Sequence, residues 1–287
     1  MRIIYTSDLH GELELYRAAG AAAVARQADA LIFGGDLCPG TPSASAVHLP
    51  RAQPEFLLRR LAPLLEAWRR DRPHLRVFAI PGNDDCQSIL PALDELASQR
   101  LIENLHQRAV SLGEFALVGL AFVPPTPFSI KDFERRDLPG ETLREPQLAR
   151  SVLGKAQGFE PIKDFEAYLD TLPTLQEELE RLPATEPTRT VAVIHSPPYQ
   201  TRCDMLFDGR HIGSRAVRAW IEQRQPLLTL HGHIHESPQL SGAFCDRIGA
   251  TIVVNPGCDY TRPHLVFIDL ENPRELEHSI YGRPQTI

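Results

Sequence analysis

The chain lacks most marks of secreted, zinc-finger and membrane proteins. Its five cysteines are odd in number, widely spaced and free of any C-x-x-C pair, which argues against a disulfide framework and a zinc knuckle. It has no run of about 18 apolar residues, and its N-terminus lacks the basic and apolar regions of a secretory signal. We therefore expect a soluble, cytoplasmic protein without a membrane partner.

An excess of basic charge is also missing. Thirty Lys and Arg residues stand against 37 Asp and Glu, which gives a net charge of −7 and argues against broad affinity for nucleic acid. The 287 residues include 43% hydrophobic residues, enough for a large core, and no internal repeat divides them. We expect one domain over residues 1–287. The 25 prolines predict long irregular connections, and a proline-rich, mixed-charge stretch at about 124–160 predicts an insertion or cap with short helices.

Apolar strand patterns alternate with helical ones along the first half of the chain. Helical patterns follow at 12–26, 56–68 with a kink at Pro63, 87–97, 165–182 with a break at Pro173, and 214–223 behind a Ser214 cap. Residues 39–54 are expected to form a polar loop, and 109–112 with 115–122 a hairpin. Further strands are expected at 250–254 and 264–270.

Five apolar strands, predicted at 2–6, 29–33, 75–80, 190–194 and 226–230, end in polar side chains. The endings contain Asp8 and His10, Asp36, Asn83, His195, and His233 with His235. Each of these endings also has a purely structural interpretation, because Asp8 could be a helix N-cap, Asp36 a turn residue and His195 a structural histidine. Strands of α/β domains deliver functional residues at their carboxyl ends, so these side chains could meet.

Together the endings contain two carboxylates, one amide oxygen and four imidazoles. If they converge, this mixed nitrogen and oxygen set suits Zn²⁺, Mn²⁺ or Fe and is too rich in nitrogen for Mg²⁺ or Ca²⁺. Seven donors are too many for one tetrahedral site. They suffice for two divalent transition metals that share a bridging carboxylate, roughly 3.5–4 Å apart.

The order D-x-H, G-D, G-N, H and G-H-x-H, from residue 8 to 235, resembles the calcineurin-like metallophosphoesterase superfamily. The resemblance implies an α/β fold, a four-layer α/β/β/α sandwich with two mixed sheets. It implies that Asp8, His10 and His235 bind one metal, that Asn83, His195 and His233 bind the other, and that Asp36 bridges them. His231 matches no ligand, and we interpret it as structural. The activity implied is hydrolysis of a small phosphoester by a metal-bridging hydroxide.

One position departs from the family pattern. Where the family has a histidine after Gly-Asn, this chain has Asp84, followed by Asp85. An aspartate beside two cations is a poor proton donor and repels an anionic phosphate. The catalytic candidates are Asp84, which stands at the position of the missing histidine, and His10, which could take over its role as proton donor, as could a water molecule. Otherwise activity is restricted to good leaving groups. We predict hydrolysis of activated aryl esters, with phosphodiesters at least as good as monoesters.

Three residues between two ligand strands are candidates for substrate binding: Arg202, Arg210 and His211. Ordinary solvated loop residues are the alternative interpretation. Two other functions stay open, a DNA nuclease on the same fold, which the acidic charge disfavours, and a non-catalytic scaffold that binds a partner protein. All seven ligand positions are intact, which favours the enzyme. The sequence predicts no oligomeric state.

Overall fold

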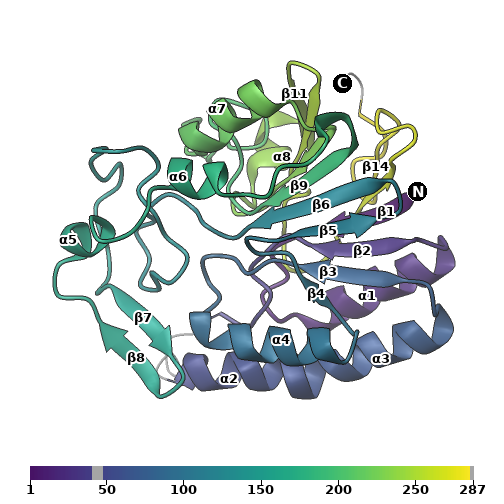
Figure 1. Ribbon diagram of the computed structural model, residues 1–287, viewed down its shortest axis with the longest axis horizontal. Helices are drawn as coiled ribbons and strands as arrows, with labels where there is room; N and C mark the ends of the chain where they lie inside the picture. Colours follow the sequence, from purple (N-terminus) through teal and green to yellow (C-terminus); the bar gives the residue numbers. More distant parts are fainter. Residues whose placement is uncertain (41–47, 285–287) are drawn as a thin grey trace.

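Two six-stranded sheets form the centre of the molecule, shown in the computed structural model, which describes residues 1–40 and 48–284 (Figure 1). The first sheet has the order β14-β13-β1-β2-β3-β4. Its strands are β1 (Arg2–Thr6), β2 (Ala30–Phe33), β3 (Arg76–Ala79), β4 (Glu103–Asn104), β13 (Val266–Asp269) and β14 (Glu277–His278). Strands β1 to β4 are parallel, and β13 and β14 add antiparallel pairings, so the sheet is mixed.

The second sheet has the order β11-β12-β10-β9-β6-β5. Its strands are β5 (Ala109–Leu112), β6 (Phe115–Leu120), β9 (Thr190–Ile194), β10 (Leu228–Leu230), β11 (Cys245–Ile248) and β12 (Thr251–Val254). The four central strands are parallel, while β5 and β11 pair antiparallel at the edges. This sheet is mixed as well.

Helices cover the outer face of each sheet, which gives four layers (Figure 1). The first sheet is covered by α1 (Leu13–Ala25), α2 (Leu49–Phe56), α3 (Ala62–Asp71) and α4 (Leu90–Ser98), with a π-helical turn at Leu57–Leu61 and a 3₁₀ turn at Gln87–Ile89. The second is covered by α6 (Leu175–Glu180) and α7 (Arg215–Arg224). The predicted α/β/β/α sandwich with two mixed sheets is confirmed.

A wholly apolar layer joins the two sheets. Ile3, Tyr5 and Ile32 face it from the first sheet, and Val191 and Val193 face it from the second, all at most 1% exposed. Burial of such side chains contributes roughly 1.5–3 kcal/mol each, so this layer fixes how the sheets face one another. The carboxyl ends of β1, β2, β3, β9 and β10 consequently open on one shared edge.

Several predicted elements differ from those observed. The predicted 165–182 helix is two short ones, α5 (Phe165–Leu169) and α6, because Thr174 and Glu177 form a capping box directly after Pro173. The predicted loop 39–54 was wrong from residue 49 on, where α2 begins with Pro50 in its first turn, a position that needs no N–H. Residues 41–47 lie outside the described part.

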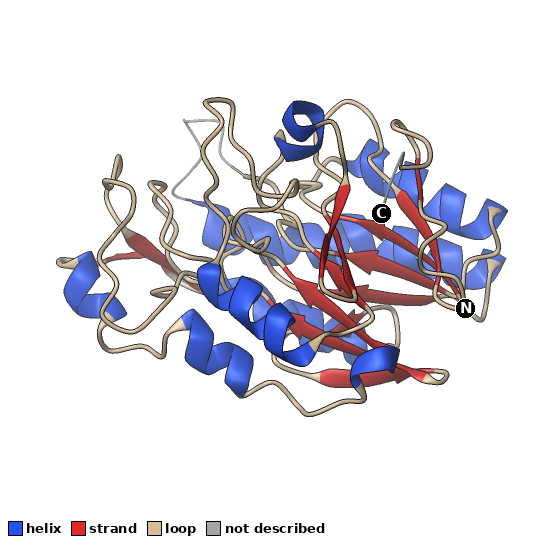
Figure 2. Cartoon of the chain, turned by 90° about the horizontal axis from the view of Figure 1, so that it is seen from above, coloured by secondary structure: helices blue, strands red, loops and turns tan. Residues whose placement is uncertain are grey.

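Helices were expected in the segment 124–160, and in its described residues there is none. The segment instead contributes β7 (Val152–Lys155) to a hairpin with β8 (Gly158–Pro161), because Gly158 has φ 140 and permits the tight turn. The hairpin and α5 lie at one end of the molecule in both views (Figures 1 and 2). The remaining short elements are a 3₁₀ turn at Pro187–Arg189 and α8 (Ser237–Ser241). No described helix is long and apolar enough to cross a membrane.

Candidate metal centre

Four of the seven predicted donors gather at the ends of β1, β2 and β10. One ligand atom from each of Asp8, His10, Asp36 and His235 lies within 4.8 Å of the others. The Nε2 atoms of His10 and His235 are 3.4 Å apart, and Asp8 Oδ1 is 3.2 Å from His235 Nε2. Asp8 and Asp36 are buried, so their charges are poorly screened by solvent. The N-cap of α1 is Glu12, so the N-cap alternative for Asp8 was wrong.

The other three donors meet beside this group. Asn83 Oδ1 lies 3.2 Å from His195 Nε2 and 2.6 Å from His233 Nδ1. His195 Nε2 lies 3.5 Å from Asp36 Oδ2, which connects the two groups through Asp36. The structure thus brings all seven predicted side chains to one place, from five different strand ends.

Backbone strain is concentrated at this place. Among the described residues, ten non-glycine residues have positive φ, and five of them are at the site: Asp8, His10, Asp36, His233 and Tyr260. Left-handed backbone at such residues is uncommon and persists only where the surrounding structure enforces it. Here backbone bonds from His10 N–H to Asp36 C=O (2.8 Å) and from Asp8 N–H to Gly35 C=O (3.0 Å) tie the strand ends together.

Two glycines make the close approach possible. A Cβ on Gly82 would lie 2.2 Å from Asp36 Oδ1, and a Cβ on Gly232 would lie 2.3 Å from Asp8 Oδ2. Any larger residue would push these carboxylates out of position. The glycines of the predicted strand endings are therefore required by the packing of the site itself.

The titratable groups influence one another strongly. Burial alone would raise the pKa of Asp8, but the nearby imidazoles, led by His235, outweigh burial and hold that pKa well below its ordinary range. Burial likewise opposes ionisation of His195, but the carboxylates of Asp36 and Asp8 raise its pKa to about 9. Burial lowers the pKa of His233 to about 3. The carboxylates are thus ionised and His233 is neutral, as metal ligands must be.

The donor chemistry fits transition-metal ions. His195 Nδ1 lies 2.8 Å from Gly34 C=O, which can only accept, so Nδ1 carries a proton. Nε2 faces Asn83 Oδ1 and the Asp36 carboxylate, which favour a proton on it as well, and a metal ion bound among the same oxygens would take the place of that proton. Imidazoles that bind metals typically have their other nitrogen fixed by such a bond. His235 follows the same pattern, because its Nδ1 lies 2.9 Å from the Tyr260 hydroxyl while Nε2 faces Asp8.

Asp84 lies at the wall of the site and Asp85 beneath it. The Asp84 amide donates to Asp36 Oδ1 (2.8 Å), and Asp84 Oδ2 is 3.7 Å from His10 Nδ1. Burial, with Asp36 and Asp85 adding to it, raises the pKa of Asp84 to about 7, a value that nearby cations would lower. Asp85 accepts bonds from the amides of Leu37, Cys38 and Gly82 and so joins two strand-end loops.

His231 has a different environment from the other two histidines of its cluster. Its Nδ1 lies 2.8 and 2.9 Å from the carbonyls of Ile194 and Ser196, and its Nε2 lies 2.8 Å from Thr229 Oγ1. Two carbonyl partners require a proton on Nδ1, and Nε2 accepts from the hydroxyl. The ring is fully buried and satisfied, and it joins the ends of β9 and β10.

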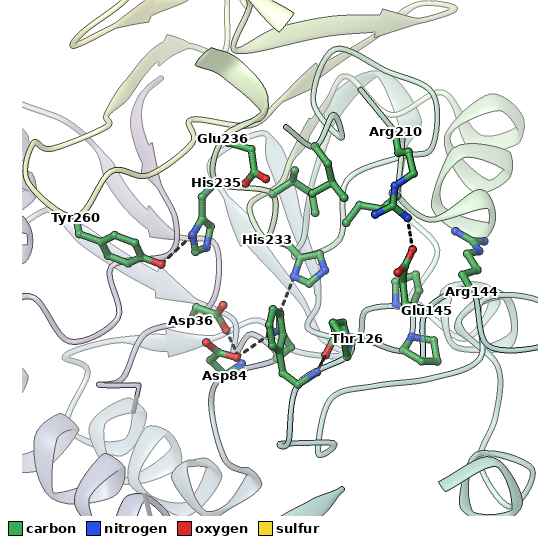
Figure 3. Close-up of a pocket in the computed structure, with 18 residues that line it drawn as sticks. Asp36, Asp84, Thr126, Arg144, Glu145, Arg210, His233, His235, Glu236 and Tyr260 are labelled. Atoms are coloured by element: carbon green, nitrogen blue, oxygen red, sulfur yellow. Dashed lines mark hydrogen bonds and ion pairs between the residues drawn. The ribbon is translucent and has the colours of Figure 1, made fainter. Parts of the chain in front are cut away.

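The site opens into a pocket of about 420 Å³ (Figure 3). His235 and Tyr260 lie at one end of the view and Arg210 with Glu145 at the other, with Asp84 and His233 between them. Pro124 to Phe128 form part of the lining, so the segment 124–160 contributes a wall. His10 is not among the lining residues.

The predicted substrate-binding residues are separated in space. Arg210 lines the pocket but pairs with Asp208 and Glu145. His211 Nδ1 lies 2.7 Å from buried Asp204, and Arg202 bonds the Ser241 carbonyl; neither lines the pocket. No described contact singles out these two as substrate ligands.

Tyr260 was missed in the sequence, although a signal was present. It follows β12, which runs parallel to β10, so its loop opens on the same edge as the histidine cluster. Gln53 was also missed, and no sequence pattern marks it. Its side chain bonds the backbone of Pro39, Asp84 and Cys86 and fixes the Asp84 loop from α2.

Comparison with known proteins gives solved structures of similar fold and one matching family. TT1561 of Thermus thermophilus is 19% identical, with a TM-score of 0.58 and coverage of 98% of both chains. Another crystal structure is also 19% identical, with a TM-score of 0.60 over 96% of this chain and 98% of its own. At such identity the likeness shows the fold alone. No curated protein matches the chain. The family model for calcineurin-like phosphoesterases, however, matches residues 1–237, and the chain belongs to that family.

Proposed function

We propose that the protein is a dinuclear metal-dependent phosphodiesterase that hydrolyses small phosphoesters. The observation that carries the proposal is the convergence of six donors around a seventh, Asp36, with His195 and His235 each held by a bond at the ring nitrogen that faces away from Asp36 and Asp8. Two divalent transition metals, Mn, Fe or Zn, would lower the pKa of a bound water and neutralise charge on the phosphate oxygens.

The seven donors would form two groups, one for each metal ion, with Asp36 between them. Asp8, His10 and His235 would hold one, as their mutual approach supports. The other would be held by Asn83, His195 and His233, whose donor atoms lie within 3.2 Å of Asn83 Oδ1. Asp36 reaches both groups and is the proposed bridge.

The preference for diesters rests on Asp84. Its side chain is 35% exposed and lines the pocket, so a bound phosphate meets its charge. A diester has one negative charge fewer than a monoester dianion, and its repulsion by Asp84 is smaller. Since His10 does not line the pocket and an ionised Asp84 is a poor proton donor, we expect good leaving groups to be required.

We further propose that residues 1–287 form one domain and that the segment 124–160 acts as the pocket's outer wall. Thr126 and Glu145 of this segment lie across the pocket from Tyr260 (Figure 3). The segment is also bonded to the first residue of α7, because the Arg215 amide donates to Asp137 Oδ2. It would shield the bound phosphate from solvent.

The test is an assay of bis(4-nitrophenyl) phosphate and 4-nitrophenyl phosphate on protein reconstituted with Mn²⁺, Fe²⁺ or Zn²⁺. We expect hydrolysis of both, faster for the diester, and about two metal ions per chain by elemental analysis. Asp36→Asn controls for contaminating phosphatases and should abolish both activities. A clear monoester preference would overturn the diester assignment, while a failure to bind metal would favour the non-catalytic scaffold.

A further inference from the structure

The pocket extends beyond the seven donors, and much of its lining is apolar. Its volume of about 420 Å³ lies within the range of roughly 300–1,000 Å³ that is typical of sites for drug-sized molecules. The apolar lining residues come from two parts of the chain, with Pro124, Pro125, Pro127 and Phe128 in the segment 124–160, and Leu206, Ile212 and Ile234 in residues 206–234. The part of a substrate beyond the phosphate can therefore contact hydrocarbon from both.

The cations of the pocket are already neutralised. Arg210 pairs with both Asp208 and Glu145, and its two partners carry more charge than it does. Arg144 donates to Asp137, Glu141 and the Gly213 carbonyl. All three nitrogens of its guanidinium therefore already have partners. A second anionic group on a substrate would have to displace these partners. The far end of the pocket thus favours an uncharged group.

The apolar wall is held in place before any ligand binds. Lys131 and Glu134 form an ion pair in which both side chains are 0% exposed, and Lys131 Nζ also donates to the Thr126 carbonyl at 2.7 Å. Thr126 Oγ1 in turn accepts from the Phe128 amide at 3.3 Å. Phe128 itself is 57% exposed, so a stiff backbone presents an aromatic ring to solvent at the mouth of the pocket. A preformed apolar surface binds with little ordering cost.

We propose that one ester group of the substrate is uncharged and apolar, an alkyl or aryl group, and that it packs between Phe128 with its neighbouring prolines and Leu206 with Ile212. This inference rests on the proposed phosphodiesterase function for its biological meaning. The binding preference itself can be measured without turnover.

Monoesters of methylphosphonic acid with alkyl groups serve as probes, because the anion has the single charge of a diester and its one ester bond has a poor alkoxide leaving group, so that it turns over slowly. Dissociation constants of the methyl, butyl and 3-carboxypropyl esters are measured by calorimetry on Mn²⁺-reconstituted protein. Each buried CH₂ contributes about 0.8 kcal/mol, or about fourfold in affinity, so the three added by butyl should tighten binding at least tenfold. The carboxypropyl ester should bind at least tenfold more weakly than the butyl ester.

Two variants locate the effect. Phe128→Ser removes the exposed ring of the wall and should reduce the butyl-to-methyl affinity ratio to below about threefold. Phe207→Ser is the matched control, because Phe207 is 76% exposed, neighbours Leu206 and does not line the pocket. It should leave the ratio unchanged.

Equal affinity for the methyl and butyl esters, or preferred binding of the carboxypropyl ester, would overturn the inference. Hydrolysis of bis(4-nitrophenyl) phosphate by the same preparation is measured in parallel. If the diester is hydrolysed while the affinities are equal, the proposed activity stands and the apolar site fails. If nothing is hydrolysed but the butyl ester binds tighter, the apolar site stands and the activity fails.

Discussion

Replacing Asp84 by Asn tests the role of its charge in substrate choice. The substitution keeps the shape of the side chain, and an amide oxygen can still accept from Asn83 Nδ2, which lies 2.9 Å from Asp84 Oδ1. The backbone of residue 84 is fixed separately, by the bonds from its N–H to Asp36 and from Gln53 Nε2 to its C=O. The variant therefore changes the charge of the wall with little change in geometry.

The magnitude follows from Coulomb's law. For two unit charges about 5 Å apart at an effective dielectric constant of about 20, the repulsion is about 3 kcal/mol. A monoester dianion has one charge more than a diester, so removing Asp84 favours the monoester by that difference. Since the side chain is 35% exposed, solvent and salt reduce the difference to about 1 kcal/mol. The monoester-to-diester ratio of kcat/KM should rise about fivefold.

The assay uses the two 4-nitrophenyl substrates at pH 8, above the value of about 7 that burial sets for the pKa of Asp84, so that the wild-type group is ionised. Metal content is measured for both proteins, to exclude loss of an ion as the cause. Asp94→Asn, on α4 and paired with Arg108, is the control for a general charge effect. A ratio that stays constant or falls, at equal metal content, would refute the electrostatic account of substrate choice.

Three further predictions concern metal affinity and stability. Tyr260→Phe removes the bond to His235 Nδ1 and should weaken metal binding about tenfold in a chelator competition, with unchanged unfolding of the metal-free protein. Burial lowers the pKa of His106 to about 3, so the unfolded state binds a proton below about pH 6.5 that the folded state does not bind, and the free energy of unfolding falls with pH. His106→Gln removes this effect. Between pH 7 and 5 its free energy of unfolding, measured in urea with chelator, should fall by about 2 kcal/mol less than that of the wild type. Lys131→Met leaves the Glu134 carboxylate buried without its cation and should cost about 3–5 kcal/mol in urea unfolding, and Lys131→Met/Glu134→Leu should recover most of it. Full stability of the single variant would show that the pair does not anchor the wall.

The sandwich with two mixed sheets was implied by the family resemblance, whereas the polar endings of the five strands, and the possibility that they meet, could be seen in local sequence patterns. Parallel strands place their carboxyl ends on one edge, so Asp8, Asp36 and Asn83, each just after such a strand, had to be neighbours. The hairpin of β7 and β8 could not be predicted, since its strands are half exposed and have no alternating apolar pattern. Tyr260 and Gln53 act through single contacts with residues far away in sequence, which leave no periodic pattern.

The departure at position 84 is easier to understand from the backbone than from the side chain. Its amide bonds Asp36, its carbonyl bonds Gln53, and Asp85 next to it accepts three amides from two loops. Five bonds therefore place residue 84 on the pocket wall whichever side chain it has. The side chain determines the charge that a bound phosphate meets, and an aspartate there replaces a proton donor with a negative charge. Exchange at this position can thus alter substrate choice while the arrangement of the seven donors is preserved.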